Sequence, residues 1–274
     1  MSTLTKTEEH PEKKVSILLS VHNDAKTIER CLESIYNQTF QDIALVIVDD
    51  FSTDTTVDII EQVSKRFSHI PCTLLTNKTN IGLTQSLNRG LEIIHSLYTA
   101  RIDADDWWEP TKLAKQVAFL DAHTDYGIVG TNYINHTETI EKKVTRPETH
   151  AEIDRSLFWR NPFAHSSVCY RTHLIQSVGS YNPSVRYAQD YELWVRCFPR
   201  TKFYNLQEFL CHRTLGSGIS VDHQNAQMKL YLKVLFTYLP KYHRPWREYG
   251  AIFEPLLVLI LPTWIKKLKR RYLS

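Results

Sequence analysis

Short apolar runs alternate with segments of helical spacing through the first part of the chain. Residues 15–21, 43–48 and 72–75 are rich in Val, Ile and Leu, as the buried strands of a parallel sheet are. Between the runs, apolar residues recur three or four positions apart, at Ile28, Cys31, Leu32 and Ile35 and again at Val57, Ile60 and Val63. This order predicts βαβ units and a mostly parallel, Rossmann-like α/β sheet flanked by helices.

Polar residues follow three of the predicted strands. Residues 20–23 end the first strand, and Asp49-Asp50 end the second. The apolar run 93–98 predicts a further strand, and a loop with three carboxylates, 103–106, comes soon after it. Because ligands of such sheets bind outside the carboxyl ends of the strands, we expect these residues to share one site.

The carboxylates of Asp103, Asp105 and Asp106 repel one another unless a positive charge lies among them. Mg²⁺ and Mn²⁺ suit such a cluster, because they accept one or two carboxylates and take their remaining ligands from substrate phosphates. The alternative is that Asp105 or Asp106 caps the helix predicted after Pro110. The cluster alone leaves both interpretations open.

The remaining composition disfavours several classes of protein. The net charge of +3 is too small to indicate nucleic-acid binding, and the five cysteines form no Cys-x-x-Cys pair. No Gly-x-Gly-x-x-Gly follows the first strand and no Walker A loop occurs, which disfavours the usual dinucleotide and P-loop modes. Residues 1–14 are polar, so we expect a disordered tail and no secretory signal, and the scattered thiols fit a reducing compartment.

The middle of the chain is less regular. Strands are predicted over 126–130 and 203–210, with a mobile polar loop near a cleft over 138–152. A second polar and flexible loop is predicted over 212–220. Between them, a helix that begins near Tyr187 has Asp190 close to its first turn.

The end of the chain combines apolar and basic residues. The run 256–261 is strongly apolar but lies between Pro255 and Pro262, and it is too short to span a bilayer, which needs about 20 apolar residues. Five basic residues follow within 266–271, with Trp264 and Tyr272 beside them. The pattern fits an anchor on an anionic membrane surface, and it fits equally a packed terminal helix with a solvated basic end.

Five segments together are similar to a known family. They are residues 15–23, 48–54, 80–83, 103–106 and 189–194, and their order resembles that of glycosyltransferase family 2 over about residues 15–220. The resemblance implies a GT-A fold and an inverting, nucleotide-sugar-dependent enzyme. It also implies a glycosyltransferase domain over 15–222, with a nucleotide-binding half at 15–125 and an acceptor-binding half at 126–222. Residues 223–274 would be a helical C-terminal extension.

The resemblance also implies roles for single residues. The metal, Mn²⁺ or Mg²⁺, would be held by Asp105 and Asp103, and Asp190 would be the catalytic base. The nucleotide sugar would be bound by Ser20, His22, Asn23, Asp49, Asp50, Asn80, Gly82 and Asp103. His212 and Arg213 could hold the leaving phosphates or could be a surface pair. His165 could line the acceptor cleft, although we expect a buried structural histidine.

Two features depart from the family pattern. Gln189 stands where a Glu commonly precedes the catalytic Asp, so Asp190 would act alone. The Gln-x-x-Arg-Trp motif of processive members is missing, which predicts the transfer of one sugar per encounter.

We therefore expect a metal-dependent hexosyltransferase that moves one sugar from a UDP-sugar to an acceptor hydroxyl. The acceptor would be a glycan or a lipid-linked glycan in lipopolysaccharide, capsule or other surface polysaccharide synthesis. The protein would be cytoplasmic and peripheral on the inner face of the plasma membrane. Two alternatives stay open, namely a metal-dependent phosphotransferase or hydrolase that uses the Asp cluster, and an inactive membrane-associated binding protein.

Overall fold

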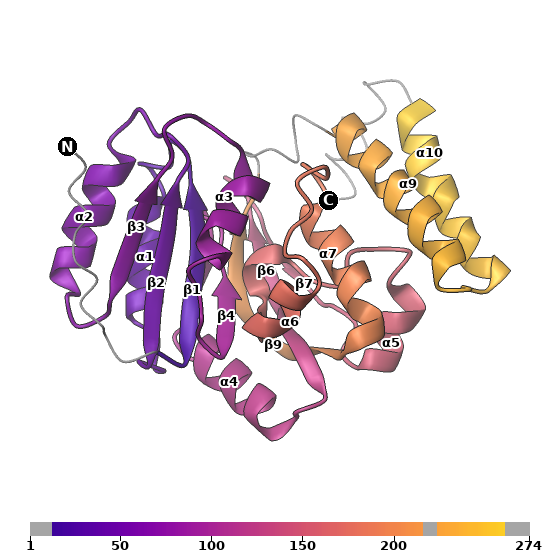
Figure 1. Ribbon diagram of the computed structural model, residues 1–274, viewed down its shortest axis with the longest axis horizontal. Coiled ribbons are helices and arrows are strands. Elements are labelled where there is room, and N and C mark those ends of the chain that lie inside the picture. The colour runs from indigo at the N-terminus through magenta and orange to yellow at the C-terminus, as the bar shows by residue number, and fades with distance from the viewer. Residues whose placement is uncertain (1–12, 216–223, 261–274) are drawn as a thin grey trace.

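A nine-stranded sheet runs through the computed structural model, which describes residues 13–215 and 224–260 (Figure 1). The strand order is β3-β2-β1-β4-β8-β6-β9-β5, and β7 pairs with β6. The four strands at one end are parallel: β1 (Val15–Val21), β2 (Ile43–Asp49), β3 (Cys72–Thr76) and β4 (Tyr98–Arg101). The parallel sheet predicted from the alternation of strands and helices is confirmed.

The other end of the sheet is mixed. The short strand β8 (Cys169–Arg171) lies antiparallel between β4 and β6 (Tyr126–His136). The long strand β9 (Lys202–Thr214) runs parallel to β6, while β5 (Trp107–Trp108) and β7 (Glu141–Val144) pair antiparallel with β9 and β6. One sheet therefore continues from residues near the start of the chain to Thr214.

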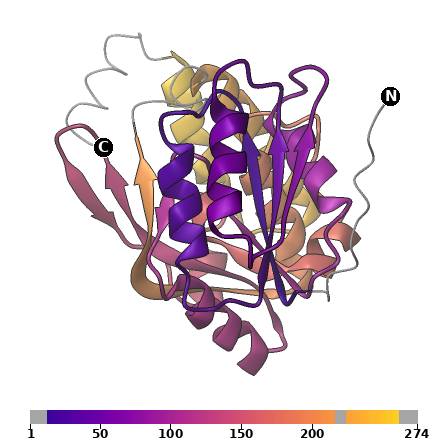
Figure 2. The same cartoon turned by 90° about the vertical axis from the view of Figure 1, so that its left-hand side faces the viewer.

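Helices cover both faces of the sheet (Figures 1 and 2). One core combines side chains of α1 (Ile28–Tyr36), α2 (Thr56–Arg66) and α4 (Lys112–Ala122) with Ile17 and Leu19 of β1. The opposite core combines α3 (Leu83–Leu91), α6 (Thr172–Ser177) and α7 (Gln189–Cys197) with Leu18. Both faces of β1 are buried, which explains why its sequence is an unbroken apolar run.

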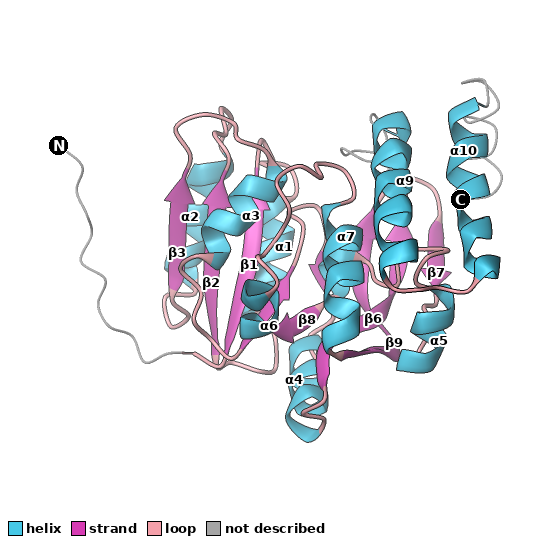
Figure 3. Ribbon diagram, turned by 45° about the vertical axis from the view of Figure 1, so that its right-hand side comes forward, coloured by secondary structure: helices cyan, strands magenta, loops and turns pink. Residues whose placement is uncertain are grey.

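The described C-terminal residues are helical. They form α9 (Gln224–Lys241), the 3₁₀ helix η3 (Trp246–Ile252) and α10 (Phe253–Ile260), which follow α7 side by side across the molecule (Figure 3). Val234, Leu235 and Leu239 of α9 share a core with Tyr191 and Val195 of α7. Among the described residues, none of the helices has the length and apolar character that crossing a membrane requires.

The strand before the carboxylate loop lies later than the sequence predicts. The apolar run 93–98 is a turn, because α3 ends at Leu91 and β4 begins only at Tyr98. Ile94 completes the core beside α3, whereas Ile93 and Leu97 are exposed. The run therefore lacks the two buried faces that a central strand has.

Two predicted loops are partly regular structure. Residues 212–214 belong to β9, so His212 and Arg213 are strand residues. Within 138–152, β7 pairs with β6, and α5 (His150–Ser156) begins with a capping box in which Thr149 and Glu152 bond each other's backbone N–H groups. The polar composition of these segments reflects partly exposed sheet positions and a helix cap. Predictions for the tail 1–12, for Ser220 and for the basic residues 266–271 fall outside the described residues.

Candidate active site

The loops that follow β1 and β2 are joined directly to each other. The Asp50 amide donates to the carbonyl of Val21 at 2.8 Å, and His22 Nδ1 lies 2.9 Å from the carbonyl of Asp50. Asn23 Oδ1 accepts from the amide of Thr53 at 2.8 Å, and Asn23 itself has a positive φ of 58°. The predicted residues at the ends of these two strands are therefore neighbours, as the parallel order requires.

Asp50 organises the next loop. Its buried carboxylate accepts three hydrogen bonds of 2.8 Å, from Asn77 Nδ2 and from the amides of Ile81 and Gly82. Gly82 is the N-cap residue of α3 and has φ +88°, a conformation that favours glycine. Asp49, next to Asp50 in the chain, is also buried, and its carboxylate accepts a hydrogen bond from the amide of Ser52. Asn77, which sequence analysis missed, is thus as central to this loop as the predicted Gly82, whereas Asn80 is exposed.

The first carboxylate of the acidic loop is paired with a buried cation. Arg101, which is fully buried, donates to Asp103 Oδ1, and Ser166 Oγ donates to Asp103 Oδ2 at 3.0 Å. Burial alone would raise the pKa of Asp103, but the charge and hydrogen bond of Arg101 hold that pKa below its usual range. Sequence analysis did not predict a role for Arg101, because arginine side chains are rarely buried.

The ionised forms of the other two carboxyl groups of the loop are destabilised. Burial and then the charges of Asp103 and Asp106 raise the pKa of Asp105 to about 8. Burial and the charge of Asp103 also raise the pKa of Asp106 to about 6. Asp24, which sequence analysis did not single out, adds a fourth carboxylate whose charge acts on Asp105. The mutual repulsion expected from the sequence is therefore present in the folded chain.

Backbone contacts hold the acidic loop in place. Arg30 Nη2 and Thr214 Oγ1 both donate to the carbonyl of Asp105, at 3.0 and 2.6 Å, and the amide of Thr214 donates to Asp106 Oδ1 at 2.9 Å. The helix-cap alternative is wrong, because α4 begins at Lys112 with Thr111 as its N-cap residue and has no side-chain cap. The carboxylates of the loop therefore do not cap α4.

A hard divalent cation fits this donor set. The oxygens are carboxylates, and the raised pKa of Asp105 reflects a concentration of negative charge that a cation would relieve. Within residues 13–215 and 224–260, no three His, Cys, Asp or Glu side chains converge as a complete metal site. A cation held by Asp103 and Asp105 would therefore need ligands from a bound molecule, as Mg²⁺ and Mn²⁺ readily accept.

Asp190 lies in the first turn of α7, as predicted. Its Oδ2 accepts from Asn161 Nδ2 at 2.6 Å. Burial raises its pKa, while Asn161 and the charges of Arg101 and Arg213 act in the opposite direction. The charges of the same two guanidinium groups also lower the pKa of Asp103, so Asp190 and the acidic loop share them.

The two basic residues at the end of β9 have different surroundings. Arg213 is partly buried, and its Nε lies 3.9 Å from Asp106 Oδ2 without a hydrogen-bond partner. Both ring nitrogens of His212 are occupied, Nε2 by Glu109 Oε1 and Nδ1 by His136 Nε2, each at 2.8 Å. The His212 ring also stacks on the Trp107 ring, and the Arg30 guanidinium lies over the same Trp107 ring. His212 therefore supports the acidic loop through Trp107.

Two further histidine and carboxylate candidates are structural. His165 is buried, as expected, and its Nε2 lies 2.8 Å from the Tyr181 hydroxyl. Burial and then the charge of Arg101 lower the pKa of His165 well below its usual value. Glu192 is buried and receives hydrogen bonds from Arg196 and Tyr238, which leaves Asp190 as the accessible carboxylate of its helix.

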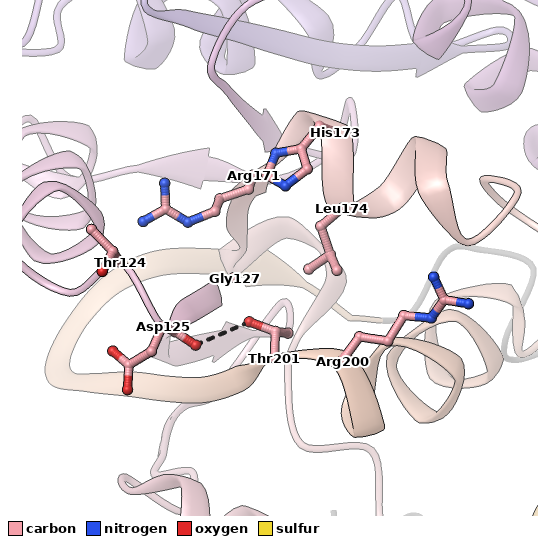
Figure 4. Close-up of a pocket in the computed structure, with 8 residues that line it drawn as sticks. All are labelled: Thr124, Asp125, Gly127, Arg171, His173, Leu174, Arg200 and Thr201. Atoms are coloured by element: carbon pink, nitrogen blue, oxygen red, sulfur yellow. Dashed lines mark hydrogen bonds between the residues drawn. The ribbon is translucent and has the colours of Figure 1, made fainter.

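A pocket of about 260 Å³ lies away from this cluster (Figure 4). It includes Arg171, which pairs with Tyr98 at the start of β4, whereas the acidic loop follows the end of β4. Arg171 is held by the carbonyls of Leu120 and Tyr126, and Thr201 bonds the carbonyl of Asp125. The pocket is thus at the opposite edge of the sheet from the candidate site.

Comparison with known proteins gives consistent matches. The sequence model of the family described as Glycosyl transferase family 2 matches residues 16–179. The "Putative glycosyltransferase EpsE" of Bacillus subtilis is 34% identical over 206 residues, which cover 72% of this chain and 71% of that protein. The "Amylovoran biosynthesis glycosyltransferase AmsE" of Erwinia amylovora is 31% identical over 185 residues, 66% of this chain and 68% of that protein.

Solved structures also resemble this chain. S. aureus TarS 1-349 in complex with UDP has a TM-score of 0.68 at 20% identity, covering 89% of this chain and 70% of that chain. The mannosyltransferase PcManGT of Pyrobaculum calidifontis, in complex with GDP-Man and Mn²⁺, has a TM-score of 0.64 at 20% identity, covering 90% and 70%. These likenesses concern the fold, and with them the expected GT-A architecture with a helical C-terminal region is confirmed.

Proposed function

Because the chain belongs to glycosyltransferase family 2, we propose that it is an inverting enzyme that moves one sugar from a UDP-sugar to an acceptor hydroxyl. The observation that supports this most is a pair of guanidinium groups, the fully buried Arg101 and the partly buried Arg213, whose charges act on both Asp103 and Asp190. A carboxylate that could remove a proton thus faces a carboxylate loop that could hold a diphosphate through a cation.

The donor would bind across the ends of β1, β2 and β4. Ser20, His22 and Asn23 would line the nucleotide site together with Asp49 and Asp50, and the loop held by Asp50 would bring in Asn80 and Gly82. TarS has been solved with UDP and with UDP-GlcNAc, which supports a uridine donor for this related fold. Arg213, whose Nε has no partner, would contact the diphosphate, while His212 would hold Trp107.

Asp103 and Asp105 would hold Mn²⁺ or Mg²⁺ together with the donor. When bound, such a cation neutralises the charge that develops on the leaving diphosphate. Arg101 keeps Asp103 ionised and holds it by a hydrogen bond, and the contacts of Arg30 and Thr214 fix the carbonyl of Asp105, so the loop would be positioned before the donor arrives.

Asp190 would act as general base. Its carboxylate would take the proton of the acceptor hydroxyl, and the oxygen would attack the anomeric carbon from the face opposite the diphosphate. The bond between that carbon and the diphosphate oxygen breaks, and the nucleoside diphosphate leaves with the electron pair. A single displacement inverts the anomeric carbon. Gln189 is buried and carries no charge, so Asp190 would act without a neighbouring carboxylate.

The acceptor would be a glycan or a lipid-linked glycan of surface polysaccharide synthesis. The name of the relative AmsE, an amylovoran biosynthesis glycosyltransferase, supports this assignment. The five cysteines are free thiols, which fits a cytoplasmic location, and a peripheral position on the inner face of the plasma membrane would bring the enzyme to a lipid-linked acceptor.

Release of UDP from a panel of UDP-sugars, with Mn²⁺ and with excess EDTA, tests this proposal. We expect cation-dependent UDP release, and we expect Asp105→Asn to lower it by orders of magnitude because the diphosphate loses a counter-charge. Asp58→Asn, the same change at an exposed position of α2, is the matched control and should have no effect. Full turnover in EDTA, or in Asp105→Asn, would remove the cation from the proposal.

The same assay separates the alternatives. Release of inorganic phosphate in place of UDP would indicate a phosphotransferase or hydrolase. Binding of UDP in calorimetry without turnover of any UDP-sugar would indicate an inactive binding protein.

A further inference from the structure

The outer helix α10 is apolar on two faces. Its inner face buries Pro255 and Val258 toward α9. Phe253, Leu256, Leu257 and Ile260 recur at helical spacing on the other side and are exposed, Phe253 to 75% and Ile260 to 79%. A helix that is hydrophobic all round is normally buried, so the outward stripe of α10 lacks a partner among the described residues.

The stripe continues on the preceding 3₁₀ helix. Trp246 begins η3 and is 87% exposed, the largest exposure among the large apolar side chains of the described residues. Figures 1 and 3 show α10 at the outer edge of the molecule, with α9 between it and α7. We call Trp246, Phe253, Leu256, Leu257 and Ile260 the apolar edge. Several large apolar side chains exposed on adjoining elements mark an interaction surface.

The charge of the chain is concentrated at the same end. Residues 224–274 contain ten Lys or Arg and two Glu, a net charge of +8, although the whole chain has only +3. The preceding residues therefore carry −5. Five of these cations lie in 266–271, shortly after α10 ends, and Lys241 and Arg247 are exposed within the described helices. The apolar edge thus belongs to the strongly basic end of a chain that is otherwise acidic.

We propose that the apolar edge docks on an anionic lipid bilayer. Apolar side chains with an interfacial tryptophan suit the boundary between headgroups and acyl chains, and the local charge of +8 attracts an acidic surface. The acidic remainder of the protein would be repelled by the same surface, which would orient the molecule with its basic end toward the lipid. This inference rests on the peripheral location proposed above and assigns the side chains that produce it.

The sequence alone opposed a packed terminal helix to a surface anchor. In the structure, one side of the helix over 256–260 is packed, because Val258 is buried. The other side is open to a surface, because Leu257 and Ile260 are exposed. The lipid-facing part therefore begins before the apolar run, at Trp246 and Phe253.

Vesicle co-sedimentation of the full chain tests the proposal. We expect binding to vesicles of about seven parts phosphatidylcholine to three parts phosphatidylglycerol, with weaker binding to pure phosphatidylcholine and at about 0.5 M NaCl. The variant Phe253→Ser/Leu257→Ser should lower the partition coefficient by about tenfold or more, because two exposed apolar side chains are lost and no buried contact is. Ile140→Ser, the same kind of change at a 63% exposed position of the β6–β7 turn, should bind as wild type.

Three outcomes would overturn the proposal. Wild type could fail to bind anionic vesicles, or the double variant could bind them as well as wild type does. Light scattering could also show a lipid-free dimer that the double variant dissociates, in which case a second copy covers the apolar edge. Calorimetry with UDP is expected to give the same affinity for all variants, so a failure of lipid docking is distinguished from a failure of the nucleotide site.

Discussion

Asp190 accepts a side-chain hydrogen bond from Asn161, and that contact sets a testable pH dependence. Burial raises the pKa of Asp190, and a base must be ionised to act, so the acidic limb of the kcat/KM profile should lie above the range of ordinary carboxyl groups. Asn161→Ala removes a bond that favours the ionised form. It should move this limb to still higher pH and leave the plateau rate much less affected. A limb that stays in place would show that Asn161 does not act on the ionisation of Asp190.

Asp190→Asn should lower transfer by about 10²- to 10⁴-fold, the usual contribution of general base catalysis. UDP affinity and the cation requirement should stay near wild type, because the proposed donor contacts lie on the other loops. Helix capping does not explain Asp190, because Ala188 is the N-cap residue of α7 and no side chain caps that helix. Turnover by the variant within a few-fold of wild type would therefore remove Asp190 from the mechanism.

His165 predicts how the free energy of unfolding changes with pH. Its pKa is lowered well below the usual value in the fold, so below about pH 6.5 the unfolded chain takes up a proton that the folded chain does not. The stabilisation present at neutral pH is thus lost progressively as pH falls from about 7 to about 5. Urea unfolding at both pH values should show a correspondingly smaller loss for His165→Gln, which keeps a partner for Tyr181. Equal losses in both proteins would contradict the assignment.

At the scale of elements, Asp50 links the end of β2 to the start of α3. Asp50→Ala would leave the amides of Ile81 and Gly82 without their acceptor, and Asn77 Nδ2 with Ser86 Oγ alone. Since an unsatisfied buried polar group costs about 1–3 kcal/mol, we expect a loss of stability of at least about 2 kcal/mol together with weaker UDP binding. Thermal unfolding and calorimetry measure the two effects.

Asp58→Ala, at an exposed position of α2, is a matched control for nucleotide binding. It should leave the affinity for UDP at the wild-type value. Normal stability and affinity in Asp50→Ala would show that the loop does not depend on this carboxylate.

The elements that the sequence predicted well are those with local signals. β1 and β2 are buried on both faces and read as continuous apolar runs, and α1 has its buried residues at the predicted positions. β9 was predicted too short because His212 and Arg213 interrupt its apolar pattern, although the strand pairs with β6 along its length. The roles of Arg101, Asn77 and Asn161 were missed because they depend on partners distant in sequence, which no local pattern encodes.

At the scale of the whole molecule, the site and the apolar edge belong to different parts of one chain. The charged groups of the candidate site lie at the ends of sheet strands and on α7, whereas the apolar edge lies two helices further out, beyond α9. Tyr191 and Val195 of α7 pack in a shared core with Leu235 of α9, and this core joins the two parts. We therefore expect changes on the apolar edge to alter where the enzyme acts without altering its chemistry.

The strand order has a consequence for synthesis of the chain. Asp106 of the acidic loop bonds Thr214, which lies 108 positions later, and β5 pairs only with β9 among the described strands. While the ribosome makes the intervening residues, β4 has no β8 beside it and the emerging half-sheet ends in an open edge. Open edges pair readily with other chains, and such distant pairings form slowly. The nascent protein is thus most prone to aggregate until β8 and β9 have emerged, and a chaperone would matter most in that interval.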